Sequence, residues 1–166
     1  MKTEWMGRYR PLVAALVQHS NAASRSMGIK KEYPDGVSLT STEWQVLEYI
    51  VEHETDDDCM LFISERLSLP QSTFSKAVKA LCAAGLVDKY HMLSNRKNII
   101  LKPTKKGAEV YEERAKMISE KNFKAFFAAL EDVSDKDLET VVNAINILNG
   151  VFGKPQDQKE TLVKIE

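Results

Sequence analysis

Apolar residues near the N-terminus recur every three or four positions, which is the spacing of one helix face. They are Trp5, Tyr9, Leu12, Val13 and Leu16. The pattern predicts a first helix from about Gly7 to Met27. The run Tyr33-Pro34-Asp35-Gly36 then predicts a turn, because proline presets φ and glycine readily adopts the left-handed conformation. A loop should therefore separate the first helix from the rest of the chain.

Three short helices are predicted in the middle of the chain. The first begins at Thr40, because Thr40 and Glu43 have the spacing of a capping box and an apolar stripe follows them. The next two cover about residues 59–67 and 71–84, and the three residues between them allow only a tight turn. Gly85 can end the third helix in a left-handed cap. The second and third helices therefore form a helix-turn-helix.

An acidic run separates the first two of these helices. Residues 52–58 hold five carboxylates in seven positions. They lack the spaced ligands and the central glycine of a calcium loop. We therefore expect a solvated loop and no cation site.

A period of two replaces the helical spacing after Leu86. The alternating residues 87–92, a polar stretch at 94–98 and the apolar run 99–101 predict a β-hairpin with a polar tip. Pro103 should close the second strand, and Thr104 can cap a following helix. A hairpin directly after a helix-turn-helix is the order of elements in a winged helix-turn-helix.

Two further helices are predicted after the hairpin. The first should run from Thr104 to about Leu130 along one apolar stripe. That stripe contains Tyr111, Ala115, Ile118, Phe123, Phe126, Phe127 and Leu130. A cap formed by Ser134 and Asp137 should begin the second helix. Gly150 and Gly153 should end it, and the polar tail from Lys154 should be frayed.

The expected fold class is mainly α with a small β-hairpin. It is a winged helix-turn-helix, residues 39–103, flanked by an N-terminal helix and loop, residues 1–38, and by C-terminal helices, residues 104–153. Residues 154–166 should form a flexible tail. The C-terminal stripes are more apolar than one pair of helices needs, which favours dimerisation through the flanking helices. An intramolecular helix core is the alternative.

The charge of the chain is unevenly distributed. The net charge of −1 gives no overall signal for nucleic acid. Between Pro70 and Gly107, however, there are eight cations and one anion, Asp88, so this segment carries +7. Such a block suits a protein that presents one face to phosphates, and an ordinary solvated basic face is the alternative.

The second helix of a helix-turn-helix places its N-terminal side chains in the major groove. On this helix the candidate DNA-binding residues carry amide, hydroxyl or ammonium groups that can meet bases and phosphates. They are Gln71, Ser72, Thr73, Ser75, Lys76 and Lys79. The wing tip adds Asn95, Arg96 and Lys97. A guanidinium such as that of Arg96 is favoured in a narrow minor groove.

Several motifs of this winged unit occur together in one known family. They are the run 62–76 with the sequence FISERLSLPQSTFSK, Gly85-Leu86-Val87, Asn95-Arg96 and Pro103-Thr104-Lys105-Lys106-Gly107. In these motifs the chain resembles the MarR family of bacterial transcription regulators. The family pattern at the wing is Asp-Arg, so Arg96 matches it and Asn95 departs from its acidic position.

The resemblance implies a homodimer that binds a pseudo-palindromic operator in double-stranded DNA. It also implies repression that a small, often aromatic, ligand relieves. By position, Trp5, Tyr9, Trp44 and Tyr111 are the candidates for lining such an effector pocket, and a plain hydrophobic core is the alternative. The oxidant-sensing and zinc-sensing variants of the family are not expected, because no cysteine precedes Cys59 and the three histidines are scattered. We expect no metal and no cofactor.

Other classes of function lack a motif in this chain. It has no phosphate-cradling glycine loop, nucleophile elbow, HExxH motif or paired cysteines, so we do not expect an enzyme. The apolar stretch 11–17 is too short to cross a membrane, and we expect a cytoplasmic protein. Cys59 and Cys82 should be reduced structural thiols. The predicted function is sequence-specific regulation of transcription, and the alternative is a winged-helix module that binds only protein.

Overall fold

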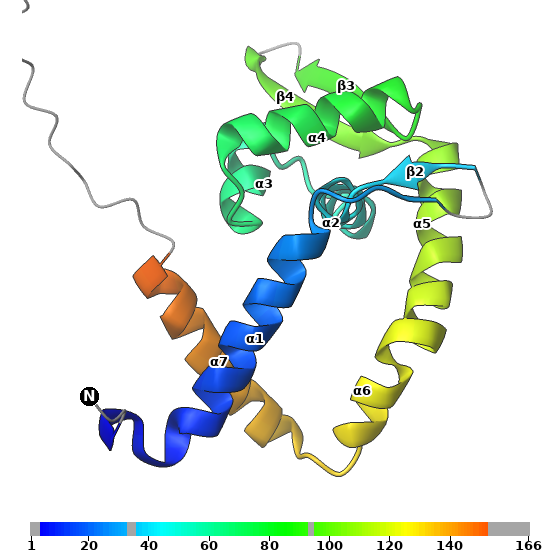
Figure 1. Ribbon diagram of the computed structural model, residues 1–166. Coiled ribbons are helices and arrows are strands. Elements are labelled where there is room, and N and C mark those ends of the chain that lie inside the picture. The colour runs from blue at the N-terminus through cyan, green and yellow to red at the C-terminus, as the bar shows by residue number, and fades with distance from the viewer. Residues whose placement is uncertain (1–3, 33–35, 93–94, 153–166) are drawn as a thin grey trace, which may run out of the picture. The chain divides into compact units, whose positions relative to one another are not determined.

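The computed structural model describes residues 4–32, 36–92 and 95–152 (Figure 1). The chain divides into two compact units, Met1–Lys116 and Met117–Glu166. Helices dominate both units, and the larger one adds two small antiparallel sheets. The expectation of a mainly α fold with a β-hairpin is therefore confirmed. None of the helices in the described part of the chain is long and apolar enough to cross a membrane.

The N-terminal helix is shorter than predicted. A 3₁₀ segment, η1 (Glu4–Tyr9), leads directly into α1 (Arg10–Ser26), and η1 itself is kinked at Gly7, whose φ is +49°. Beyond α1, β1 (Lys31–Glu32) pairs with β2 (Ser38–Leu39), where only a loop was expected. The first three residues of the predicted turn, 33–35, lie outside the described residues.

The helix-turn-helix is confirmed almost to the residue. Helix α2 (Ser41–Glu52) begins with the predicted capping box, in which the Thr40 amide donates to the Glu43 carboxylate at 2.8 Å and the Glu43 amide donates to Thr40 Oγ1 at 3.2 Å. Helices α3 (Met60–Arg66) and α4 (Gln71–Ala83) follow. Gly85 ends α4 with φ at +70°, the left-handed cap that the sequence predicted.

The predicted hairpin consists of β3 (Val87–Met92) and β4 (Asn95–Pro103). The second strand starts at Asn95, before the expected Ile99, so the polar residues 95–98 belong to the strand and not to the tip. The pairing is regular from Val87 to His91 and then shifts, because His91 faces Ile99 while Met92 faces Asn95. A bridge between Cys59 and Ile100 attaches the start of α3 to the outer side of β4.

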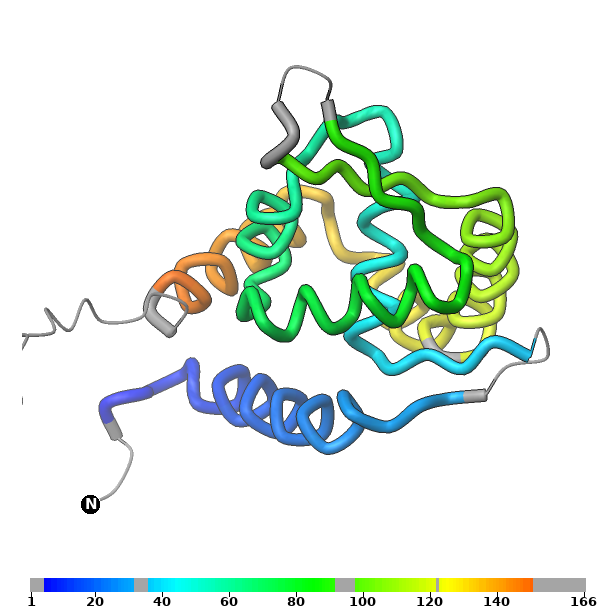
Figure 2. Tube along the Cα trace, turned by 90° about the horizontal axis from the view of Figure 1, so that it is seen from above, coloured from blue at the N-terminus to red at the C-terminus, as the bar shows by residue number. Residues whose placement is uncertain are grey.

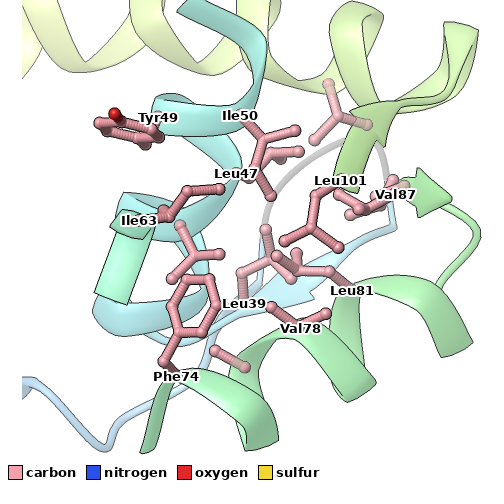
Figure 3. Close-up of a cluster of buried hydrophobic side chains, with 14 of the residues drawn as sticks. Leu39, Leu47, Tyr49, Ile50, Ile63, Phe74, Val78, Leu81, Val87 and Leu101 are labelled. Carbon is pink, nitrogen blue, oxygen red and sulfur yellow. The ribbon is translucent and has the colours of Figure 1, made fainter. Parts of the chain in front are cut away.

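One hydrophobic core holds the helix-turn-helix to the hairpin. Phe74, Val78 and Leu81 of α4 are completely buried and point toward the α2 side chains (Figure 3). Leu101 of β4 and Leu47 of α2 complete the centre of the cluster. Because the buried positions of α4 repeat at helical spacing, its other face is left to solvent. In Figure 2, β3 turns back from the C-terminal end of α4.

The C-terminal helices differ from the prediction in two places. The expected helix from Thr104 to Leu130 is divided into α5 (Lys105–Ile118), a π-helical segment η2 (Ser119–Phe123) and α6 (Lys124–Ala129). Helix α7 (Asp135–Phe152) begins as expected, since the Asp137 amide donates to Ser134 Oγ at 3.2 Å. Gly150 does not end α7, because it lies within that helix, whereas Gly153 and the tail lie outside the described residues.

Hydrogen bonds and a close backbone contact join the start of α5 to the end of α4. The Thr104 amide donates to the Leu86 carbonyl at 3.0 Å, and the Thr104 hydroxyl donates to the Gly85 carbonyl at 2.8 Å. The Gly107 amide in turn donates to the Thr104 hydroxyl oxygen at 3.0 Å. A Cβ on Gly107 would lie 2.0 Å from the Leu86 carbonyl oxygen. The two segments can approach this closely only because position 107 has no side chain.

This contact predicts a large loss of stability for Gly107→Ala. The added methyl group must push backbone against backbone, and such overpacking should lower the free energy of unfolding by at least about 2 kcal/mol. Urea denaturation followed by circular dichroism measures the change. Gly28→Ala is the control, because a Cβ at Gly28 would meet nothing within 4 Å. An equal, small effect of both substitutions would contradict the proposed close contact.

Candidate nucleic-acid interface

Helix α4 presents a polar face to solvent. All six candidate residues on this helix are exposed polar side chains whose positions follow the helical repeat. They are Gln71, Ser72, Thr73, Ser75, Lys76 and Lys79. Phe74, Ala77, Val78 and Leu81, which alternate with them, are buried. The exposed face therefore carries hydroxyl, amide and ammonium groups, and the opposite, apolar face holds the helix in the core.

The N-terminal half of this face is suited to an anion. Pro70 is the N-cap of α4 and gives no side-chain cap, so the first amides of the helix have no capping acceptor. Backbone amides at a helix N-terminus attract phosphate oxygens. Lys76 and Lys79 form no ion pair within the described part of the chain. Both ammonium groups therefore remain available to an external anion.

Gln71 is held by the neighbouring helix. Its Oε1 lies 2.8 Å from the hydroxyl of Ser64, a side chain that is 1% exposed in α3. The single proton of this hydroxyl is shared between Gln71 Oε1 and the Leu61 carbonyl oxygen, which also lies 2.8 Å from Ser64 Oγ. An amide pairs with adenine in a bidentate manner only when both of its ends are available. In this arrangement Gln71 joins α3 to α4, a role that the sequence analysis did not anticipate.

The wing lies next to α4, since β3 packs against that helix. The backbone of Asn95, Arg96 and Lys97 forms the first part of β4. Their side chains lie outside the described part of the structure, so their predicted contact with the minor groove stays a prediction. The exposed Lys89 of β3 adds another cation to the hairpin.

Two lysines of the basic block are engaged within the protein. The Lys106 ammonium donates to the Ala84 carbonyl at the end of α4, at 3.1 Å. Lys105, by contrast, is 92% exposed and only reaches to 3.8 Å from the Glu109 carboxylate, one turn further along α5. Lys102 forms an ion pair with Asp57 at 3.0 Å. The +7 segment therefore contains structural cations as well as cations that face solvent.

The acidic run is exposed at residues 52 and 54–57, as predicted, and some of its groups also bind neighbouring elements. Tyr49 donates its hydroxyl to Asp58 at 2.8 Å, and Tyr111 donates its hydroxyl to Glu52 at 2.6 Å. Burial and the hydrogen bond to Asp58 raise the pKa of Tyr49 to about 12. The hydrogen bond to Glu52, with burial, raises the pKa of Tyr111 to about 12. The loop thus joins α2, α5 and β4.

The four predicted pocket residues fall into two groups. Trp44 and Tyr111 stack with their ring centroids 5.6 Å apart, between α2 and α5. Trp5 and Tyr9 lie in η1 and are 77% and 58% exposed. The structure brings the first pair together, and no contact within the described residues joins Trp5 or Tyr9 to it.

Arg114 is a buried cation that the sequence analysis missed. Only 2% of this residue is exposed, its guanidinium carbon lies 5.7 Å from the centroid of the Trp44 ring, and it donates to the Val37 carbonyl. The available signal was its position, since Gly107, Val110 and Arg114 share one face of α5 and all three are buried. Because Arg114 is cationic, a search for apolar residues at helical spacing did not mark position 114 as buried.

The remaining candidate groups form no reactive site. Cys59 and Cys82 are unpaired and partly buried, and burial raises the pKa of the Cys82 thiol. A higher pKa keeps this thiol protonated and less nucleophilic. In the described part of the chain, no three histidine, cysteine or carboxylate side chains are placed to hold a metal ion together.

Comparison with known proteins finds a family match within the winged unit and similar folds among solved structures. Residues 37–91 match the model of the MarR family. The transcriptional regulator SlyA has 20% identity and a TM-score of 0.62, with 86% of this chain and 94% of SlyA covered. Zinc-responsive ZitR of Lactococcus lactis has 19% identity and a TM-score of 0.58, with 86% and 97% covered. Streptococcus pneumoniae FabT, in complex with DNA, has 13% identity and a TM-score of 0.60, with 87% and 96% covered. No curated protein sequence matches the chain.

The two tyrosine–carboxylate bonds predict a loss of stability at high pH. A tyrosine ordinarily has a pKa near 10, so between about pH 10 and 12 the unfolded chain loses protons that Tyr49 and Tyr111 still hold in the folded protein. Stability from these groups is complete below about pH 10 and is lost as the pH rises to about 12. The double variant Tyr49→Phe/Tyr111→Phe should lose less stability than the wild type over this range.

Urea midpoints at pH 8 and pH 11 test this prediction. The values at pH 8 measure the cost of removing the two hydrogen bonds, separately from the change with pH. If the midpoint falls by the same amount in the variant and the wild type, the two tyrosines do not cause the loss.

Proposed function

Because the chain carries a MarR-family domain over residues 37–91 within the fold of that family's transcription regulators, we propose that it is a cytoplasmic, sequence-specific DNA-binding repressor. The observation that carries this proposal is the solvent-facing surface of α4. Its hydroxyl groups and the unpaired ammonium groups of Lys76 and Lys79 lie on a helix whose other face is fixed in the core. This helix enters the major groove, and the wing residues Arg96 and Lys97 approach the adjacent minor groove.

The protein acts as a homodimer. This part of the proposal is supported by apolar side chains that each unit leaves exposed on α1, η2, α6 and α7. Examples are Leu12 and Val17 of α1, Phe126 of α6 and Val142 of α7. Isolated apolar side chains are common on protein surfaces, but runs of them along whole helices indicate an interface. A second copy covers these faces and presents two winged units to a pseudo-palindromic operator.

A small aromatic ligand relieves repression. Support for this part comes from the stacked rings of Trp44 and Tyr111 and from the exposed Trp5 and Tyr9. Flat aromatic side chains bury a planar ligand with little loss of conformational entropy. The ligand acts by binding one conformation of the dimer more tightly than the one that binds DNA.

Lys76→Ala and Lys79→Ala should each weaken DNA binding and reduce its dependence on salt. Each phosphate contact contributes about 0.9 to the slope of log K against log salt concentration, so either loss should lower the slope by about 1. The probe is a fragment of genomic DNA that the wild-type protein binds and retains. Fluorescence anisotropy with this probe measures both the affinity and its dependence on salt. Lys30→Ala is the control, because Lys30 is an exposed lysine outside the basic block. Arg96→Ala should weaken binding without lowering the melting temperature.

The results of these experiments distinguish a DNA-binding regulator from a module that binds only protein. Wild-type protein that retains no duplex DNA at low salt would refute the regulator and favour a module that binds only protein. An Arg96→Ala variant with a large loss of stability would contradict the assignment of Arg96 to the wing.

Phe126→Asp should dissociate the dimer. The Phe126 side chain is 55% exposed in the single chain, so the substitution should cost the isolated chain little. Burying an aspartate in an apolar interface should raise the dimer dissociation constant at least about 30-fold. Sedimentation velocity over a range of concentrations measures this constant. Lys89→Glu, at an exposed position of β3 outside the proposed dimer faces, is the control, and a wild type that stays monomeric at high concentration would refute the dimer.

A further inference from the structure

We propose that Lys102 positions the wing and does not contact DNA, although it belongs to the basic block. Lys102 acts by binding, through its ammonium group, the acidic loop between α2 and α3. This inference rests on the proposed function, because it concerns how the wing is set for DNA. It assigns a structural purpose to an acidic run that by its charge alone opposes binding to phosphates.

The ammonium group of Lys102 has three acceptors around it. Its Nζ lies 2.6 Å from the Glu54 carbonyl oxygen, 3.0 Å from Asp57 Oδ1 and 3.5 Å from the Asp56 carbonyl oxygen. An ammonium has three N–H donors. The three acceptors match these three donors, and the side chain is only 28% exposed. Lys102 therefore has little capacity left for a phosphate, unlike Lys76 and Lys79.

The position of Lys102 connects the wing to the rest of the winged unit. Lys102 lies in β4 two residues after Ile100, whose backbone bridges to Cys59, the residue that follows the acidic loop. At the same end the loop is also joined to α2, because Tyr49 donates to Asp58, the residue before Cys59. Two attachments, the Cys59–Ile100 bridge and the Lys102 contacts, thus fix β4 relative to α2. If either attachment is lost, the two-stranded hairpin of β3 and β4 is held less firmly at its base.

The proposal makes a prediction whose sign is opposite to that of simple electrostatics. The Asp57 carboxylate repels DNA phosphates within about 8–10 Å at moderate salt. Removing its charge should strengthen DNA binding if charge alone matters. If Asp57 holds Lys102, the same change should weaken binding, because the wing loses its fixed direction.

The experiment compares Asp57→Asn with Glu54→Gln in the full-length protein. Both substitutions remove one negative charge from the same loop. The Glu54 group that binds Lys102 is its backbone carbonyl, which Glu54→Gln retains. Anisotropy titrations against the same retained DNA fragment should show affinity reduced about fivefold by Asp57→Asn. Glu54→Gln should leave the affinity unchanged or raise it.

Lys102 variants give a second readout. Lys102→Met should lower the affinity while leaving the slope of log K against log salt concentration at the wild-type value, because no phosphate contact is lost. Lys102→Arg, which keeps the cation, should restore much of the affinity. Urea midpoints of all variants show whether each is folded at the temperature of the titration.

Each outcome decides the matter. An affinity of Asp57→Asn equal to or higher than that of Glu54→Gln, or a slope lowered by about 1 in Lys102→Met, would overturn the positioning role while DNA binding itself stands. A wild type that binds no DNA would instead refute the proposed function, so the two failures are distinguishable.

Discussion

The close contact between the start of α5 and the end of α4 is the constraint on which the winged unit depends. The hairpin leaves α4 at Leu86 and returns at Thr104, and the hydrogen bond between these two backbones closes it at its base. Gly107 permits that approach because a Cβ there would overlap the Leu86 carbonyl. Three elements therefore share one junction: the polar helix α4, the wing and α5. The direction of the wing relative to α4 is set first by this backbone contact.

Local signals in the sequence predicted the element order and most helix ends. The Thr40–Glu43 capping box and the Gly85 cap depend on neighbouring residues alone, so their patterns are visible without the fold. The β1–β2 ladder was missed because two-residue strands carry no periodicity. Arg114 was missed because its burial depends on Trp44 and Val37, which are distant in sequence. The π-helical segment likewise has no distinctive residue pattern.

The candidate site was predictable in composition but not in the roles of its members. Exposure of Ser72, Thr73, Ser75, Lys76 and Lys79 followed from helical periodicity. The contact of Gln71 with Ser64 did not, because it depends on how α3 crosses α4. In the same way a count of charges could not separate Lys102, which is enclosed by the acidic loop, from Lys76, which faces solvent. Net charge over a segment shows where cations are, whereas their partners decide what they do.

The engagement of Gln71 has a consequence for how selective this protein can be. With one end of that amide held by Ser64, the front of α4 offers hydroxyl groups at positions 72, 73 and 75. A hydroxyl both donates and accepts, so it tolerates several base edges and rejects few of them. In the proposed complex with DNA, discrimination among sites would then depend mainly on how easily each duplex bends and narrows. Such a protein would accept a family of related sites that differ in stiffness.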